Sequence, residues 1–153
     1  MPLIWRVVKG KHAATAFDGK AAQRFGGRWN LPGRRAVYAS ATKSLAVLEV
    51  LVHLDVGRQV PRLVAFTFDV DDRLVERLPA ARLPRHWRTS RGLAVTQEIG
   101  DDWLASGHAL ALAVPSAIVP EEVNYLLNPV HPAFRRIKFG RSVSFLLDPR
   151  VVG

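Results

Sequence analysis

One carboxylate stands out in an apolar stretch near the middle of the first half of the chain. Residues 45–54 hold eight apolar side chains in ten positions, and Glu49 is the one acid among them. Burying a carboxylate is costly unless positive charge or hydrogen-bond donors compensate, so Glu49 is a candidate catalytic group. The alternative is that Glu49 lies on a narrow polar stripe with His53, one helical turn later, and contacts solvent.

A second candidate lies in the run Gly-Gly-Arg-Trp-Asn, residues 26–30. Two glycines let the backbone approach a ligand, the guanidinium of Arg28 matches phosphate, and Trp29 or Asn30 can line a base or a ribose. A diphosphate nucleotide would suit such a loop. The run lacks the spacing of a P-loop or of a dinucleotide fingerprint, and the alternative is a tight turn whose tryptophan packs in the core.

Other polar groups stand at the ends of apolar runs. Tyr38 precedes the apolar stretch and can stack on a flat ring, and Ser116, which follows Pro115, can hydrogen-bond a sugar or a phosphate. A tyrosine or a serine at such a position, taken alone, more often has a structural role than a binding role. The run Asn-Tyr-Leu-Leu-Asn-Pro at residues 124–129 is typical of Asx turns.

The composition excludes several kinds of chemistry. The 153 residues include no cysteine, which excludes disulfides, thiolate zinc sites, iron–sulfur clusters and cysteine nucleophiles. The histidines show neither His-x-x-x-His nor His-Glu-x-x-His spacing, and no Gly-x-Ser-x-Gly elbow occurs, so we expect no metal site and no serine hydrolase. Because no apolar run is long enough to span a membrane or to act as a signal, we expect a soluble cytoplasmic protein.

Positive charge is concentrated in the first third of the chain. Lys and Arg number 22 against 13 Asp and Glu, a net charge of +9, which favours an anionic ligand or an acidic partner. Residues 1–44 contain a single acid, Asp18, and nine basic residues: Arg6, Lys9, Lys11, Lys20, Arg24, Arg28, Arg34, Arg35 and Lys43. Residues 73–91 contain six arginines and a single acid, Glu76. These arginines form either a solvated surface or part of a binding surface.

The elements that must position these groups are mostly short strands. We expect strands at residues 4–8, 36–39, 63–70, 109–114, 118–119, 137–139 and 143–147. We expect one helix at residues 44–54, capped by Ser40 or Thr42 and closed by Gly57, and another at residues 96–106, ended by Gly107. Residues 26–33 should form a loop, and residues 71–96 should be irregular. No repeat or linker divides the chain, so the pattern predicts one α+β domain with a mainly antiparallel or mixed sheet.

Taken in order, these pieces resemble the RES domain family, the toxin half of RES–Xre toxin–antitoxin pairs. The matching pieces lie at residues 27–33, 37–40, 45–53, 114–119 and 124–129, so the resemblance covers nearly the whole chain. The arginine, glutamate and serine that name the family fall at Arg28, Glu49 and Ser116. The resemblance therefore implies that residues 1–153 form a single RES domain.

The resemblance implies an ADP-ribosyltransferase-like fold, with mixed or antiparallel sheets and flanking helices, that takes NAD as its substrate. It implies catalytic roles for Glu49, Arg28 and Tyr38. The NAD-binding residues would be Arg28, Tyr38, Ser116, Trp29 and Asn128. The implied activity is cleavage of NAD at the nicotinamide–ribose bond, by hydrolysis or phosphorolysis, which depletes cellular NAD. The alternative is ADP-ribosylation of a protein target with NAD as the donor.

The resemblance also implies a partner, an Xre-type antitoxin with a helix-turn-helix domain, whose C-terminal segment closes the NAD site. Direct DNA contact by this chain is not expected, and a homo-oligomeric toxin within that complex is one arrangement that the family allows. The residues alone also permit a basic nucleic-acid-binding module, built from the arginines and aromatics of residues 5–35, whose binding weakens steeply with salt. A third alternative is an interaction domain that retains only the fold.

Overall fold

The computed structural model describes residues 2–54 and 59–151, whose strands form one mixed sheet in the order β4-β5-β6-β2-β1-β3-β7. The strands are β1 (Leu3–Lys9), β2 (Val37–Ser40), β3 (Leu63–Asp69), β4 (Val75–Arg77), β5 (Ala111–Pro115), β6 (Val123–Leu127) and β7 (Arg141–Phe145). The α-helices are α1 (Lys20–Phe25), α2 (Lys43–Leu51) and α3 (Leu93–Ser106). The pairing of β4 with β5 is parallel, and the other pairings are antiparallel. The predicted α+β class with a mixed sheet is confirmed.

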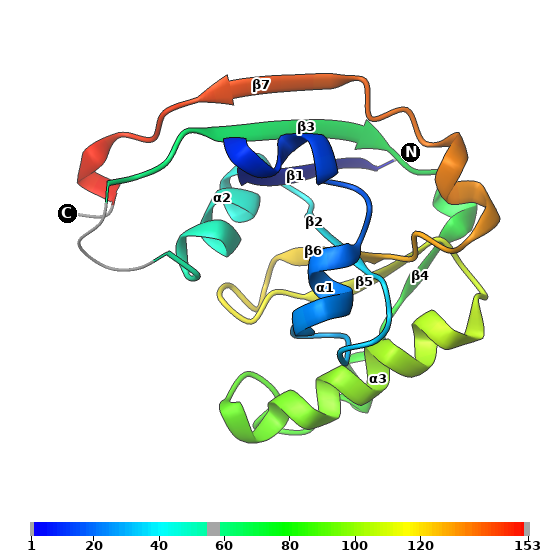
Figure 1. Cartoon of the computed structure of the whole chain (residues 1–153). Helices are drawn as coiled ribbons and strands as arrows, with labels where there is room; N and C mark the ends of the chain where they lie inside the picture. Colours follow the sequence, from blue (N-terminus) through cyan, green and yellow to red (C-terminus); the bar gives the residue numbers. More distant parts are fainter. Residues whose placement is uncertain (1, 55–58, 152–153) are drawn as a thin grey trace.

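The sheet opens at the junction of β1 and β2. β1 pairs with β3 from Leu3 to Lys9, but with β2 only through Trp5 and Ser40. The strands therefore diverge into two half-sheets, one made of β7, β3 and β1 and the other of β2, β6, β5 and β4 (Figure 1). Arg6 bridges the opening, because its Nε donates to the carbonyl of Ala16 at 2.5 Å and its Nη1 donates to the carbonyl of Tyr38 at 2.7 Å.

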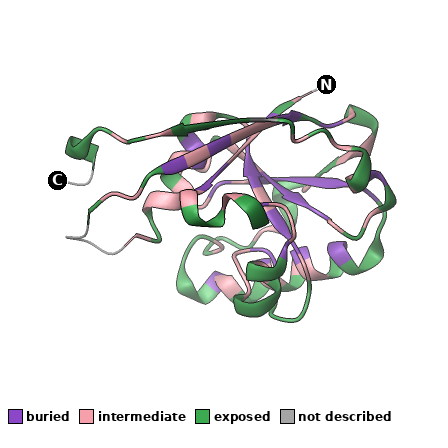
Figure 2. Ribbon diagram, turned by 45° about the horizontal axis from the view of Figure 1, so that its top comes forward, coloured by how far each residue is buried: buried purple, intermediate pink, exposed green. Residues whose placement is uncertain are grey.

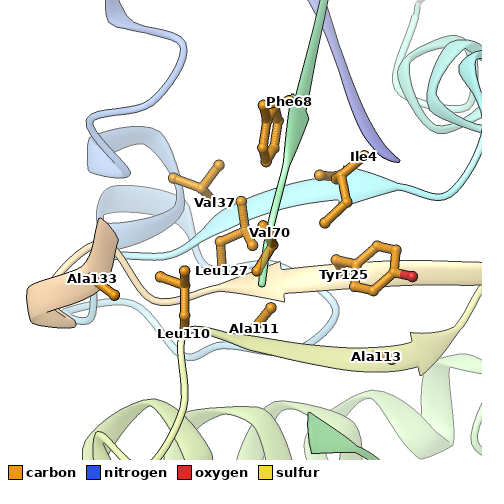
Figure 3. Packing of buried hydrophobic residues seen from close by; sticks show 11 residues of the cluster. Ile4, Val37, Phe68, Val70, Leu110, Ala111, Ala113, Tyr125, Leu127 and Ala133 are labelled. Atoms are coloured by element: carbon orange, nitrogen blue, oxygen red, sulfur yellow. The ribbon is translucent and has the colours of Figure 1, made fainter. Parts of the chain in front are cut away.

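The facing sides of the two half-sheets enclose the largest core cluster. Ile4 and Phe68 come from one half-sheet, and Val37, Tyr125 and Leu127 come from the other; Figure 3 shows them converging. None of these five side chains is more than 5% exposed. Because successive strand side chains point to opposite faces, the residues between them are directed to the outer faces of the sheet.

Helices cover those outer faces. Ala46 of α2 packs with Val7 and Leu63 on the half-sheet of β1 and β3, while Trp103 of α3 packs with Leu126 on the half-sheet of β5 and β6. The inner strands are therefore buried, whereas the edge strand β7 is largely exposed (Figure 2). α2 and α3 are the helices that carry or support the candidate site.

Most of the predicted elements are present with shifted ends. β1, β2, β3 and β5 correspond to the strands expected at residues 4–8, 36–39, 63–70 and 109–114. The helix expected at residues 44–54 is α2, and Thr42 caps it, since its side chain accepts a hydrogen bond from the backbone N–H of Leu45 at 3.1 Å. The expected closure at Gly57 lies outside the described residues.

Five predicted details differ from the structure. Residues 118–119 are not a strand, because their N–H groups donate to the side chain of Ser116 instead of to a neighbouring strand. Residues 137–139 are not part of a strand, and the closing strand expected at residues 143–147 lies two residues earlier, at Arg141–Phe145. α3 begins three residues before the expected position. The segment expected to be irregular contains the short strand β4, which lies on the edge of the sheet beside β5.

Two further elements, α1 and β6, were not predicted. α1 is a single short helix between Gly19 and Gly26, and both of these glycines have a positive φ. β6 was interpreted as part of an Asx-turn segment, yet it is a central strand that pairs with both β2 and β5. Only a non-local pairing distinguishes such a strand from a turn-rich segment of similar composition.

Candidate active site

Glu49 of α2 is directed toward the end of the β5–β6 pair. Its Oε1 accepts two hydrogen bonds, one from Ser116 Oγ at 3.0 Å and one from Asn124 Nδ2 at 2.6 Å. Glu49 therefore does not belong to a solvent-facing stripe, which removes the alternative interpretation. Within residues 2–54 and 59–151, no hydrogen bond reaches Oε2, so this second oxygen is available to a ligand.

Ser40 of β2 sets the orientation of Asn124. The two residues are register partners on β2 and β6, and Ser40 Oγ donates to Asn124 Oδ1 at 2.7 Å. With its oxygen engaged by Ser40, the Asn124 amide presents its nitrogen to Glu49. Sequence reasoning did not find this pair. The one available signal was a polar residue at the start of an apolar run, which is also what an Asx turn would show.

Ser116 is completely buried, and its hydroxyl has three partners. Its Oγ accepts the backbone N–H groups of Ile118 and Val119, each at 3.1 Å, and donates to Glu49. A hydroxyl oxygen has two acceptor positions, and here both are used by backbone groups. The hydroxyl proton is therefore directed at Glu49, so this serine orients the carboxylate.

The turn that carries Arg28 rests on α3. Thr96 Oγ1 donates to the carbonyl of Arg28 at 2.7 Å. A Cβ built on Gly100 would lie 1.8 Å from the carbonyl oxygen of Trp29, so the backbone of α3 packs directly against the turn. Every residue other than glycine at position 100 would push the turn away.

Tyr38 joins the same turn to the sheet. Its hydroxyl donates to Asn30 Oδ1 at 2.6 Å and accepts from the backbone N–H of Trp29 at 3.0 Å. Burial raises the pKa of Tyr38 above its ordinary value, so the hydroxyl stays protonated and remains a donor at neutral pH. A Cβ on Gly27 would lie 2.7 Å from the Tyr38 hydroxyl, which explains the glycine at this position of the turn.

These contacts bring Arg28 and Glu49 to the same face of the sheet. Tyr38 and Ser40 are two residues apart on β2, so their side chains share a face and their backbones are roughly 7 Å apart. Tyr38 holds the turn of Arg28, and Ser40 holds Glu49 through Asn124.

In the part of the chain that the structure describes, the Arg28 guanidinium contacts one carbonyl, that of Trp87 at 3.3 Å, and no carboxylate. Its other N–H groups are free to bind an anion.

Comparison with known proteins identifies the family. The family model for the RES domain matches residues 3–148. The chain belongs to the RES domain family. It is 36% identical to "Toxin Res" of Yersinia enterocolitica, with 97% of this chain and 99% of the relative covered, and 36% identical to "Toxin Res" of Photorhabdus laumondii, with 98% and 97% covered. It is 35% identical to "Prs ADP-ribosylating toxin" of a Sphingobium species, with 97% and 96% covered.

Two of the expected NAD-binding residues of this RES domain lie apart from Glu49. Trp29 is 2% exposed and packs with Trp103 in the core, as the alternative interpretation of the turn proposed. Asn128 is 3% exposed, follows the far end of β6 from Asn124, and donates to the carbonyl of Leu104 at 3.1 Å. Asn128 also borders a surface hollow of about 220 Å³. The structure therefore groups the side chains of Arg28, Tyr38, Ser116 and Glu49, whereas the side chains of Trp29 and Asn128 are buried outside that group.

Two further features concern metals and membranes. Over residues 2–54 and 59–151, no group of three His, Asp or Glu side chains is arranged to hold a metal ion. Among the helices of the same residues, none combines the length and the apolar character needed to cross a bilayer.

Proposed function

We propose that this RES domain, residues 1–153, is the toxin of a toxin–antitoxin pair, and that it breaks the nicotinamide–ribose bond of NAD. The similarity to two proteins named "Toxin Res" over nearly their whole length supports the first part. The observation that carries the second part is the Glu49 carboxylate: two donors hold Oε1, Oε2 is open, and a cationic side chain without an acidic partner lies on the same face.

Glu49 would act by electrostatic stabilisation. As the bond breaks, its electron pair leaves with nicotinamide, which becomes neutral, and positive charge develops on the ribose ring. A fixed carboxylate beside that charge lowers the barrier, and it does so best when it needs no reorganisation during the reaction. Ser116 and Asn124 supply the fixation in advance. When water is the acceptor, it adds to the ribose and loses a proton, which yields ADP-ribose.

Arg28 and Tyr38 would bind the rest of the dinucleotide. The unused N–H groups of the Arg28 guanidinium suit the diphosphate, and the Tyr38 ring, held by its hydroxyl, can stack on nicotinamide. Ser116 is completely buried and its hydroxyl is fully hydrogen-bonded within the protein, so its position supports a role in orienting Glu49 and not the expected contact with the nucleotide. The NAD-binding roles expected of Trp29 and Asn128 receive no support from their positions.

The acceptor of the ADP-ribosyl group separates two versions of the function. Transfer to water or to phosphate would deplete NAD, and this is the version that we favour. Transfer to a protein is the second candidate, because one relative is named "Prs ADP-ribosylating toxin". Mass analysis of the products, with and without added phosphate, distinguishes free ADP-ribose, its phosphate ester and a modified protein.

We also infer an Xre-type helix-turn-helix antitoxin as the partner, and the cytoplasm, where NAD is available, as the place of action. The net charge of +9 would attract an acidic segment of the antitoxin electrostatically. The alternative function, a nucleic-acid-binding module, accounts for the positive net charge, but it gives no role to the hydrogen-bonded Glu49 carboxylate.

The test is nicotinamide release from NAD by purified protein. Glu49→Gln keeps the size of the side chain but removes its charge, so we expect a loss of about 100- to 1000-fold in rate with an unchanged fold. Glu98→Gln is the matched control, because Glu98 is an exposed glutamate on α3; it should keep the wild-type rate. Wild-type turnover by the Glu49 variant would refute the proposed mechanism.

A further inference from the structure

The arginine-rich segment between β4 and α3 reaches the candidate site through Arg88. This exposed side chain makes two hydrogen bonds to the turn between β5 and β6: Nε donates to the carbonyl of Ala117 at 2.9 Å, and Nη2 donates to the carbonyl of Ile118 at 3.3 Å. Figure 1 shows α2, the β5–β6 turn and the start of α3 on the same side of the molecule. One guanidinium thus binds two successive peptide groups.

The same two peptide groups bind Ser116 on their opposite side. The first joins Ala117 to Ile118, and its N–H donates to Ser116 Oγ at 3.1 Å. The second joins Ile118 to Val119, and its N–H donates to the same atom at 3.1 Å. The C=O and N–H of a trans peptide point in opposite directions, so both peptide groups lie between the Arg88 guanidinium and the Ser116 hydroxyl.

We propose that Arg88 is a positioning residue for Glu49, a role that rests on the proposed NAD-cleaving function. The guanidinium fixes the two peptide groups, their N–H groups fix Ser116 Oγ, and the Ser116 proton is thereby aimed at Glu49 Oε1. A cation at the carbonyl end of a peptide also polarises its N–H, since linked hydrogen bonds strengthen one another. Arg88 therefore acts on the carboxylate without touching substrate.

The residue before Arg88 connects the segment to the other half of the site. The carbonyl of Trp87 accepts a hydrogen bond from Arg28 Nη1 at 3.3 Å, and the Trp87 ring lies 6.0 Å from that of Trp29. Residues 87 and 88 thus link the arginine turn to the loop that orients Glu49. The segment fixes the two charged groups of the site relative to each other.

The first test compares Arg88→Ala with Arg85→Ala. Arg85 is also exposed on the same segment, and among the described residues it makes no side-chain hydrogen bond or ion pair, so its loss removes the same charge without the contacts. We expect Arg88→Ala to lower kcat for nicotinamide release about tenfold, the lower end of what a charge-assisted hydrogen bond provides at an exposed position. KM for NAD should change little, and Arg85→Ala should match wild type. Equal kcat in the two variants would overturn the proposal.

The second test asks whether Arg88 acts through Ser116. In a Ser116→Ala background the hydroxyl is absent, so adding Arg88→Ala should lower kcat by less than about twofold more. A further tenfold loss in the double variant would show that Arg88 acts by another route, and it would contradict the proposal. Arg88→Lys keeps the charge but cannot span two carbonyls in a fork, so its kcat should lie between those of wild type and Arg88→Ala.

Hydrogen exchange of the Ile118 and Val119 amides separates this inference from the proposed function. By NMR, both amides should exchange faster in Arg88→Ala than in Arg85→Ala, whether or not the protein turns over NAD. If wild-type protein releases no nicotinamide while this exchange difference is present, the proposed function is wrong and the orienting contact stands. If the two variants exchange alike at both amides, the positioning role of Arg88 is wrong.

Discussion

At the scale of single residues, the defining feature of this RES domain is the unequal use of the two Glu49 oxygens. Ser116 and Asn124 both donate to Oε1. The carboxylate is thereby held from one side, and its charge remains available at the other oxygen. A carboxylate fixed in this way can stabilise a developing cation without first being reoriented.

Removal of the Asn124 donor should reduce catalysis more than it reduces stability. We expect Asn124→Ala to lower kcat for nicotinamide release about 10- to 100-fold, because one of the two hydrogen bonds that orient Glu49 is lost. Ser40→Ala leaves the amide in place but releases its oxygen, so a smaller loss of a few fold is expected.

Ser142→Ala is the control for the serine change, since Ser142 is an exposed residue of β7. It should behave as wild type in the same steady-state assay. Full kcat in Asn124→Ala would show that Ser116 alone is enough to orient Glu49.

At the scale of elements, the decisive contact is the one between α3 and the arginine turn. Gly100 meets the backbone of Trp29, and the next helical turn toward the N-terminus supplies Thr96, which binds the carbonyl of Arg28. One side of the helix therefore supports the turn in two ways: Gly100 allows close approach of the backbone, and the Thr96 hydroxyl binds a carbonyl of the turn. This arrangement determines where the Arg28 side chain begins.

Gly100→Ala should displace that turn. The added methyl group would lie 1.8 Å from a backbone oxygen, so overpacking should cost about 1–3 kcal/mol of unfolding free energy. For a domain of this size, Tm should fall by roughly 2–12 °C, and KM for NAD should rise because Arg28 moves. Gly140→Ala is the control, because a Cβ there has open space. Equal Tm and KM in the two variants would contradict this view of α3.

The sequence indicated some of these elements but not how they meet. Glu49 is a candidate because one acid in an apolar helix is a local anomaly, and Arg28 is a candidate because two glycines precede a side chain suited to phosphate. Asn124 and Arg88 were not assigned to the site, because each acts on a residue far away along the chain, and nothing in the local pattern specifies those pairings. The prediction of a strand at residues 118–119 was wrong because the Ser116 side chain accepts the N–H groups that a strand partner would have bound.

At the scale of the whole molecule, the opening between the two half-sheets sets the position of Tyr38. Arg6 crosses that opening and donates to the carbonyls of Ala16 and Tyr38. Burial lowers the pKa of Arg6 to about 10, so the guanidinium is still charged at neutral pH. At this junction the two half-sheets are joined by the Trp5–Ser40 ladder position and by the half-buried Arg6 side chain.

Arg6→Met should therefore destabilise the fold. The change keeps much of the apolar stem but leaves two carbonyls without their donor, and each such loss costs about 1–3 kcal/mol, so we expect a drop of roughly 2–6 kcal/mol in the free energy of unfolding by urea. Arg62→Met is the control, because Arg62 is exposed and, among the described residues, its side chain bonds only the surface residue Ser144. It should lie within about 0.5 kcal/mol of wild type. Equal unfolding midpoints would show that Arg6 does not join the half-sheets.

The order of the strands also has a temporal consequence. β2 is synthesised well before its neighbour β6, which begins only at Val123. Glu49 therefore emerges from the ribosome long before Ser116 and Asn124, the residues that orient it. Pairings between such distant segments form late, because closing a long loop comes first. A nascent chain that stops before Asn124 would contain the carboxylate but not the amide that orients it, so Glu49 takes up its final position only after β6 has been made.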